Sequence, residues 1–162
     1  MPAYFPMFVN LSQKRIRVYG AGQIALRRVT GLLRYGALVT VIAPEIHDNI
    51  RQLQKKHAQQ LSIEQRQYRS SEIVKEHTDY VLAATNDASV NTMIYQECRQ
   101  KQIPVNNASC AGQCDFYFPA LVERDGLIIG VTSTDGNHKK TAQFCKRLRQ
   151  RHLLRTDGTE RL

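Results

Sequence analysis

Apolar and polar residues alternate between Arg15 and Glu45 in the order expected of a strand, a glycine turn, a helix and a second strand. A β-favouring run at 16–19 ends at Gly20, and apolar residues then recur every 3.6 positions, which is the pattern of an amphipathic helix. Gly36 is expected to end this helix, because the residue at that position usually has a positive φ. The apolar run at 39–43 indicates a strand buried in a parallel sheet.

The alternation of predicted strands and helices continues to about residue 106. The apolar stretch at 4–9 is expected to pack across the edge of the sheet. The patterns predict helices at 45–57, at 71–76 with Ser70 as N-cap, and after an Asp87 N-cap through Cys98, and strands at 61–65, 80–85 and 103–106. Strands that alternate with helices are typical of an α/β fold with a doubly wound, Rossmann-like parallel sheet.

The pattern changes after the small polar loop at 107–113. Two alternating runs, at 116–122 and 127–132, are joined by a segment that contains Asp-Gly, which is a hairpin signal. A hairpin is marginally stable alone, and the basic helix that follows Gly136 can cover only one face. We therefore predict a nucleotide-binding domain at 1–113 and a dimerisation segment of hairpin and helix at 114–162, which pairs two chains into a homodimer. The tail from Thr156 is expected to be disordered.

The glycine turn carries the clearest candidate chemistry. Residues 20–25 read G-x-G-x-x-A between a strand and a helix. Gly20 would permit the tight turn, Gly22 would let the backbone approach a pyrophosphate, and Ala25 would let the helix pack close to the strand. The free N–H groups at the start of the helix favour such an anion. The alternative is a glycine turn that only connects two packed elements.

The end of the second strand bears on the choice of cofactor. A ribose-binding acid usually stands there, but this strand ends in Ala43-Pro44 and the first carboxylate is Glu45. Glu45 could reach a ribose hydroxyl or lie in the first turn of the next helix. No Arg or Lys lies between Val39 and Ile50 to pair a 2′-phosphate, which favours NAD over NADP. Thr85 and Asn86, with Ala84 before them, should line the other side of the cofactor, or they are ordinary loop residues.

Composition narrows the possible partners. The 162 residues carry a formal charge of +9, which suits a polyanion: nucleic acid, an anionic membrane, or a small molecule with several carboxylates. The excess of basic residues is concentrated at 138–155, which could form either a solvated helix or a nucleic-acid-binding surface. Phe144 is the only aromatic residue there, whereas a single-strand binder usually has several for base stacking. There is no long apolar span and no signal-peptide pattern, so a cytoplasmic protein without membrane or nucleic-acid partners is expected. Its four cysteines are expected to be reduced thiols.

Several segments in order resemble the precorrin-2 dehydrogenases, which also form the N-terminal module of siroheme synthases. The resemblance implies NAD-dependent oxidation of precorrin-2 to sirohydrochlorin, and some members of that family also insert ferrous iron. By position, it implies that NAD is held by Gly20, Gly22, Gln23, Ile24, Pro44, Glu45, Thr85 and Asn86, and that Ser133 lies near the tetrapyrrole. The likeness rests on residues 5–8, 18–22 with Ala25, 39–45, 83–87 with Asn91, 103–106, 114–120 and 133–136.

The chain departs from this family at one position. Many relatives have a catalytic aspartate shortly after the fifth strand, where this sequence has Ser109. A neutral hydroxyl is a poor general base near pH 7. The candidate catalytic residues are therefore Asp115, Ser109 and His138, although Asp115 could equally be a strand-start acid that accepts backbone N–H groups. A catalytically impaired carrier or sensor of tetrapyrrole or nucleotide is the alternative function, and a nucleic-acid binder is a third.

Metal binding is not predicted. Cys110 and Cys114 are separated by three residues, which does not match the common C-x₂-C ligand pair of zinc sites.

Overall fold

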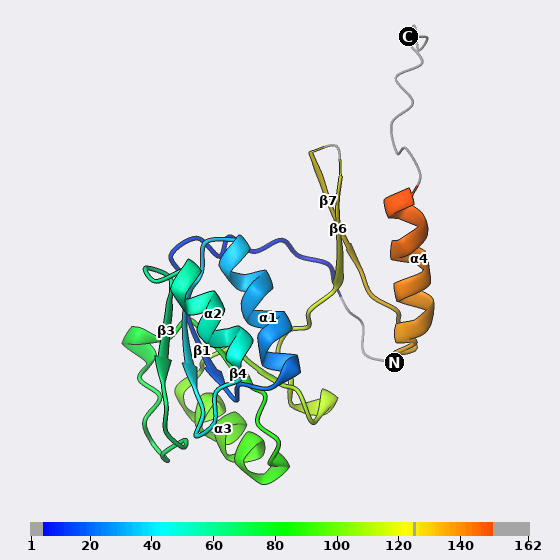
Figure 1. Cartoon of the computed structure of the whole chain (residues 1–162). Helices are drawn as coiled ribbons and strands as arrows, with labels where there is room; N and C mark the ends of the chain where they lie inside the picture. The colour runs from blue at the N-terminus through cyan, green and yellow to red at the C-terminus, as the bar shows by residue number, and fades with distance from the viewer. Residues whose placement is uncertain (1–4, 125, 151–162) are drawn as a thin grey trace, which may run out of the picture. The chain divides into compact units, whose positions relative to one another are not determined.

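The computed structural model describes residues 5–124 and 126–150, which form two compact units (Figure 1). The larger unit is Val9–Tyr117, and the smaller one combines residues 5–8 with 118–124 and 126–150. The sequence places a boundary after Gln113, four residues before the division between the units. The predicted disordered tail from Thr156 lies outside the described residues.

The larger unit is built on a parallel five-stranded sheet with the order β3-β2-β1-β4-β5. Helices α1 and α2 pack on one face of the sheet, and α3 packs on the other. This arrangement confirms the doubly wound α/β prediction, and the order reverses between β1 and β4, where such sheets bind ligands. The elements are β1 (Arg15–Tyr19), α1 (Gln23–Arg34), β2 (Leu38–Ile42), α2 (Asp48–Lys56), β3 (Leu61–Glu64), β4 (Tyr80–Ala83), α3 (Ala88–Lys101) and β5 (Val105–Asn107).

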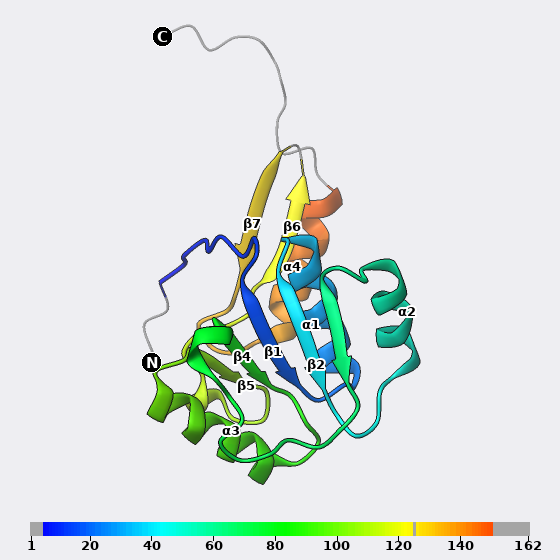
Figure 2. The same ribbon diagram turned by 90° about the vertical axis from the view of Figure 1, so that its left-hand side faces the viewer.

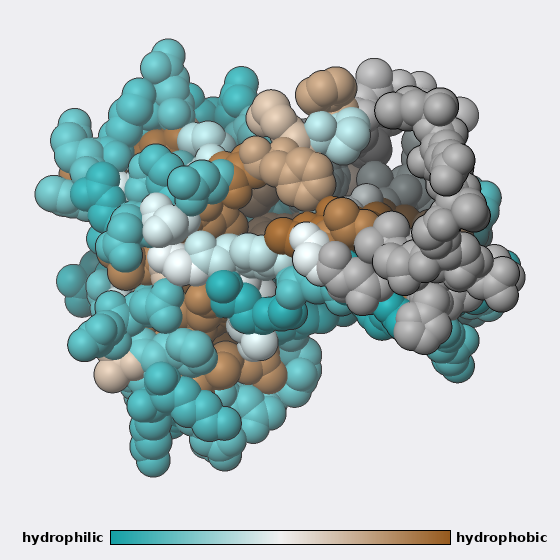
Figure 3. Space-filling view, turned by 90° about the horizontal axis from the view of Figure 1, so that it is seen from above, coloured by the Kyte–Doolittle hydropathy of each residue, from teal (hydrophilic) through white to brown (hydrophobic). Residues whose placement is uncertain are grey.

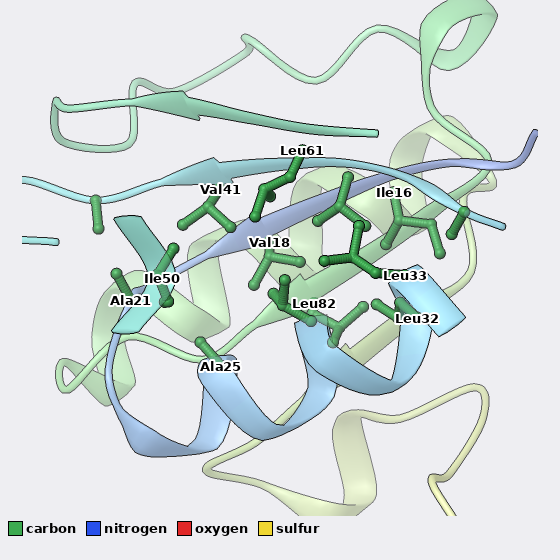
Figure 4. Packing of buried hydrophobic residues seen from close by; sticks show 14 residues of the cluster. Ile16, Val18, Ala21, Ala25, Leu32, Leu33, Val41, Ile50, Leu61 and Leu82 are labelled. Carbon is green, nitrogen blue, oxygen red and sulfur yellow. The ribbon is translucent and has the colours of Figure 1, made fainter. Parts of the chain in front are cut away.

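Alternation along the strands separates two apolar clusters. Ile16 and Val18 of β1 point to the α1 side, where Ala25 and Leu33 meet them (Figure 4). Tyr19 points to the opposite side, where it packs with residues of α3. Each fully buried aliphatic side chain stabilises the fold by about 1.5–3 kcal/mol relative to exposure. The buried strands therefore form a fixed base for the loops at their carboxyl ends.

Two predicted helices differ from the structure. The helix predicted at 45–57 begins only at Asp48, because the imidazole Nδ1 of His47 accepts the N–H of Asn49 at 3.2 Å and caps it. The helix predicted at 71–76 is wrong: Ser71 has φ +66°, and only the 3₁₀ turn η1 (Lys75–His77) forms. The carboxylate of Glu97 accepts the backbone N–H groups of Ser71 and Ile73, at 3.0 and 2.8 Å, which holds this segment against α3 in a non-helical path.

The smaller unit contains the predicted hairpin. Strands β6 (Ala120–Arg124) and β7 (Leu127–Val131) pair antiparallel, and Gly126 has φ +75°. The first strand begins after Pro119, later than predicted, because proline has no N–H to donate to a partner strand. Helix α4 (His138–Gln150) packs against β6, where Val122 and Cys145 are buried.

The apolar N-terminal stretch behaves differently from the prediction. Phe5, Met7 and Phe8 are at least three-quarters exposed, so the expectation that they pack across the sheet edge is wrong. This segment groups with the smaller unit in the structure, and Tyr4 lies outside the described residues.

Candidate functional site

The first glycine of the turn is required by the backbone beside it. Gly20 has φ +107°, and its N–H donates to the carbonyl of Ile42 at 2.9 Å. A Cβ at Gly20 would lie 2.2 Å from the carbonyl oxygen of Ala84, far inside the contact limit. The turn therefore lies tightly against the carboxyl ends of both β2 and β4, where a doubly wound sheet binds its ligand.

The second glycine leaves an open approach to α1. Gly22 is the N-cap of α1, with φ −82° and ψ −169°, and makes no side-chain cap hydrogen bond. A Cβ placed on Gly22 would meet none of the described atoms within 4 Å. Ala25, one turn along, is fully buried against the strands. The first N–H groups of α1 thus face a space that suits a pyrophosphate, so the residues present fit a dinucleotide.

The end of β2 places Glu45 outside the helix. Pro44 and Glu45 are exposed and form a bend before α2 begins, so the alternative that Glu45 lies in the first helical turn is wrong. A basic residue lies beside this bend: Arg51 donates to Gln65 Oε1 at 2.7 Å, and Gln65 Nε2 donates to the carbonyl of Pro44 at 3.2 Å. Arg51 stands just past the stretch from Val39 to Ile50, so it lies outside the segment on which the predicted preference for NAD rests.

His47 contributes to the site although no sequence pattern predicts it. Its Nε2 lies 2.8 Å from the side-chain amide nitrogen of Gln23, the first residue of α1. Its Nδ1 accepts the N–H of Asn49 at 3.2 Å. His47 thereby ties the glycine turn to the N-cap of α2. Histidine is not among the usual N-cap residues, so no local pattern indicates this role.

Asn91 organises the loop that follows β4. Its side chain is fully buried, and its Oδ1 accepts the backbone N–H and the hydroxyl of Thr85 at 3.0 and 2.8 Å. Its Nδ2 donates to the Thr85 carbonyl at 3.2 Å and to the Ser109 hydroxyl at 3.0 Å. Asn91 therefore fixes Thr85 and links it to the loop after β5.

Asp87 begins α3 as predicted. Its carboxylate accepts the N–H groups of Ser89 and Val90 at 2.8 and 3.3 Å. A hydrogen bond from the Ser89 hydroxyl, together with these N–H groups, holds the pKa of Asp87 below its ordinary value.

The hydroxyl of Ser109 is engaged on both sides. It donates its proton to Asn107 Oδ1 at 2.7 Å and accepts from Asn91 Nδ2. Ser109 is exposed, so it lies at the surface of the same edge as Thr85. The structure therefore brings Ser109 to the candidate cofactor edge, where its hydroxyl holds neighbouring loops.

The other two candidate catalytic residues are placed elsewhere. Asp115 Oδ2 accepts the N–H of Val105 at 3.0 Å, and its Oδ1 accepts from Arg99 at 3.0 Å, which is the arrangement of the strand-start acid considered as its alternative. His138 is the first residue of α4 in the smaller unit and is exposed. The catalytic roles of Asp115, Ser109 and His138 stay predictions.

Ser133 lines a hollow in the smaller unit. The hollow has a volume of about 300 Å³, and its walls include the basic residues Lys140 and Arg147 and the ring of Phe144. Asp135 also lines the hollow; its carboxylate accepts the N–H of Asn137 at 3.0 Å, and this bond keeps the pKa of Asp135 below its ordinary value. The lining combines two cations, one carboxylate, hydroxyl groups and an aromatic ring, and its cations suit an anion with an apolar body.

Two further observations concern metals and membranes. In residues 5–124 and 126–150, no group of three or more His, Cys, Asp or Glu side chains is arranged to hold a metal ion, and the cysteines are unpaired thiols. Within the same residues, no helix has the length and apolar character needed to cross a bilayer.

Comparison with known proteins gives a consistent result. A family model described as putative NAD(P)-binding matches residues 7–120. The "probable multifunctional siroheme biosynthesis protein HemA" of Ruminiclostridium josui is 35% identical over 147 residues, which cover 90% of this chain and 28% of that protein. The siroheme synthase of Psychrobacter sp. (strain PRwf-1) is 34% identical over 132 residues, which cover 80% of this chain and 26% of that protein.

A solved structure agrees with these sequence relatives. "SirC, precorrin-2 dehydrogenase" superposes with a TM-score of 0.76 at 25% identity and covers 91% of this chain and 70% of that one. The chain spans little more than a quarter of the two curated relatives, at 28% and 26% of their lengths. These matches confirm the resemblance found in the sequence, and the chain belongs to the putative NAD(P)-binding family that its residues 7–120 match.

Proposed function

We propose that this chain oxidises precorrin-2 to sirohydrochlorin with NAD, as a step of siroheme formation. The observation that carries the proposal is the glycine turn, where Gly20 lies against the β4 backbone and the space over Gly22 is open. The likeness to a structure named as a precorrin-2 dehydrogenase, over 91% of the chain, supports the choice of substrate. The location in the cytoplasm stays a prediction.

The chain's own residues would bind and orient the cofactor. When bound, a nicotinamide dinucleotide supplies a hydride acceptor. The N–H groups of Gln23 and Ile24 follow the open N-cap at Gly22, which suits them to the pyrophosphate. Thr85 and Asn86 continue the same edge at the end of β4, and Asn91 fixes the position of Thr85. Catalysis would then depend chiefly on alignment.

The preference for NAD over NADP rests on the bend after β2. The carboxylate of Glu45 is exposed there and would repel a 2′-phosphate, while Arg51 on α2 could attract one. We propose that Glu45 dominates, because Arg51 is already bonded to Gln65. Calorimetric titration of both cofactors should show tighter binding of NAD, and Glu45→Gln should narrow the difference. Tighter binding of NADP by the native chain would show that Arg51 decides the preference.

The hollow around Ser133 is a candidate for the substrate's carboxylates. Precorrin-2 is an acidic tetrapyrrole, and Lys140 and Arg147 present two cations beside the ring of Phe144. Guanidinium and ammonium groups form the stronger, charge-assisted hydrogen bonds with carboxylates. Lys140→Gln and Arg147→Gln should therefore each weaken tetrapyrrole binding and leave NAD affinity unchanged. Unchanged tetrapyrrole affinity in both variants would remove the hollow from the proposal.

We further propose a homodimer formed through the hairpin. Helix α4 packs against β6, whereas Leu127 and Ile128 of β7 each remain 46% exposed. Apolar side chains of this kind appear brown among teal polar ones on the surface in Figure 3. A two-stranded hairpin with exposed leucine and isoleucine is expected to gain stability from a partner. Sedimentation at micromolar concentration should report a dimer, and a clean monomer would contradict this assignment.

The presence of Ser109 in place of the aspartate of many relatives supports one competing function, a carrier or sensor that binds its ligand without turnover. Its neutral hydroxyl already donates to Asn107, so it is poorly suited to accept protons. We expect hydride transfer to survive, because it depends on alignment, and metal insertion to be weak, because two pyrrole-type N–H protons must leave. Ser109→Asp should then raise chelation more than dehydrogenation. Strong chelation by the native chain would show that another group, Asp115 or His138 first, serves as base.

The experiment that separates these functions supplies the native chain with precorrin-2 and NAD and follows sirohydrochlorin by absorbance. Formation of sirohydrochlorin supports the dehydrogenase. Tight tetrapyrrole binding without turnover would instead support the carrier.

A further inference from the structure

A second polar site lies on the sheet itself, on the face that carries α3. Side chains alternate along the strands, so Arg17 of β1 points to the same face as Tyr19, which packs in the cluster with α3. The strand register aligns Arg17 with Thr40 of β2 and Thr40 with Ser62 of β3. These three polar side chains therefore form a row across three neighbouring strands.

This row is open where the rest of the face is covered. Helix α3 packs against β4 and β5, which lie on the other side of β1 from β2 and β3. Figure 2 views the face directly, and no helix stands in front of β2 or β3. At the carboxyl end, Tyr19 and Ile42 are covered by Tyr68 and Ile73. At the amino end, the strands border a hollow of about 240 Å³.

The lining of the hollow is basic and rich in donors. The lining includes the basic residues Arg15 and Arg17 together with His77, and none of the described lining residues is acidic. The hydroxyls of Thr40 and Ser62 lie 2.9 Å apart and bond to each other across β2 and β3. Guanidinium groups match phosphoryl and carboxylate oxygens in geometry, and hydroxyls can donate to the same oxygens.

A neighbouring carboxylate holds Arg15 in place. Asp79 Oδ2 lies 3.6 Å from Arg15 Nε, and Asp79 Oδ1 lies 3.5 Å from Lys14 Nζ. The Arg15 backbone N–H donates to Asp79, and with the two cations it keeps the pKa of Asp79 below its ordinary value. Lys14, Arg15 and Arg17 together outnumber this carboxylate, so this end of the sheet remains positive.

His77 contributes to the same arrangement. Its Nδ1 lies 3.4 Å from Arg15 Nη1, and arginine can only donate, so Nδ1 is the acceptor of this contact. These contacts engage Nε and Nη1 of Arg15, and Nη2 takes part in neither. Two other acids, Glu64 in the next row and Glu72 in the segment after β3, are both bonded to Arg66.

We propose that this hollow binds a small oxyanion, a phosphoryl or polycarboxylate group, between Arg15 and Arg17 with the hydroxyl of Thr40 or Ser62 as a further donor. The site is separate from the proposed cofactor edge. Arg15 begins β1 and Gly20 follows its end, and a strand of this length spans about 15 Å. Such a site would let a cellular anion bind the sheet without occupying the glycine turn.

The test is a titration of the full chain with inorganic phosphate and, separately, with citrate, at constant ionic strength and with backbone amide shifts as the readout. The amides of β1, β2 and β3 that border the hollow should shift on titration. Arg17→Gln should weaken binding at least tenfold. Arg17→Lys keeps the positive charge but loses the planar guanidinium group that can bond two oxygens at once, so it should weaken binding less. Arg69→Gln removes an equal charge from an exposed loop outside the hollow and should change affinity less than twofold.

Binding of phosphate alone would identify a phosphoryl ligand, and binding of citrate alone a carboxylate ligand. Either result, with the Arg17 dependence, supports the site. Saturating NAD should leave these shifts unchanged. The proposal is overturned if neither anion binds at constant ionic strength, if Arg17→Gln binds as tightly as the native chain, or if Arg69→Gln loses as much affinity as Arg17→Gln.

Discussion

Replacing Gly22 with valine should abolish dinucleotide binding and leave the fold intact. The backbone at Gly22 has φ −82°, which any residue adopts, and an added Cβ meets no described atom within 4 Å. The change removes a tolerated N-cap residue, so the free energy of unfolding should fall by about 1 kcal/mol or less. The new side chain stands over the first N–H groups of α1, where we place the pyrophosphate. Calorimetry should show NAD affinity reduced at least tenfold, or about 1.4 kcal/mol.

Two other glycines serve as matched controls. Gly20→Ala combines φ +107° with a Cβ 2.2 Å from the Ala84 carbonyl oxygen. It should lower the free energy of unfolding by about 1–3 kcal/mol or more. Gly31→Ala lies within α1 with open space around its Cβ and should stabilise the helix by about 0.5–1 kcal/mol without changing NAD affinity. A folded Gly22→Val variant with native NAD affinity would refute the nucleotide assignment, and a Gly20→Ala variant as stable as the native chain would refute the close approach to β4.

Three further predictions concern stability, loop position and assembly. Burial opposes ionisation of Glu97, but hydrogen bonds from Lys101, Tyr68 and the Ile73 N–H lower its pKa overall. The ionised carboxylate of Glu97 therefore stabilises the fold at pH values above its ordinary pKa, and this stabilisation is lost as the pH falls through the lowered pKa of the folded state. Urea unfolding should show that Glu97→Gln lowers the free energy of unfolding by about 1–3 kcal/mol near pH 7 and by less near pH 3. Asn91→Ala should lower NAD affinity and stability together, measured by calorimetry and thermal unfolding, and native NAD affinity in a folded variant would show that Thr85 needs no such support. Ile128→Lys should convert a sedimenting dimer to a monomer with NAD affinity retained, whereas a dimer of undiminished stability would place the interface elsewhere.

The regular part of the fold follows from the sequence because burial repeats with the same period as the backbone. The run at 16–19 alternates between two buried clusters, and α1 ends before Gly36, whose φ is +77° as its position predicts. The predicted helix at 71–76 failed because its backbone partners lie on Glu97, 26 residues beyond Ser71. No local pattern reports a bond of that range.

The candidate site was predictable only in part. The glycines follow from a motif with a known mechanical reason and Thr85 from its place at the end of a buried strand, and the structure brings them to one edge of the sheet. His47 and Arg51 were missed because their contacts, with Gln23 and Gln65, join segments that are distant in sequence. The engaged hydroxyl of Ser109 also depends on the position of Asn91, which the sequence does not reveal.

The most direct test of the account is turnover of precorrin-2 by the native chain and by Gly22→Val, with NAD in excess and both products followed by absorbance. We expect the native chain to form sirohydrochlorin and NADH in equal amounts, and the folded variant to form neither above the uncatalysed rate. Equal turnover by the two proteins would contradict the assignment of the glycine turn. Sirohydrochlorin formation by the native chain without matching NADH would contradict the proposed reaction.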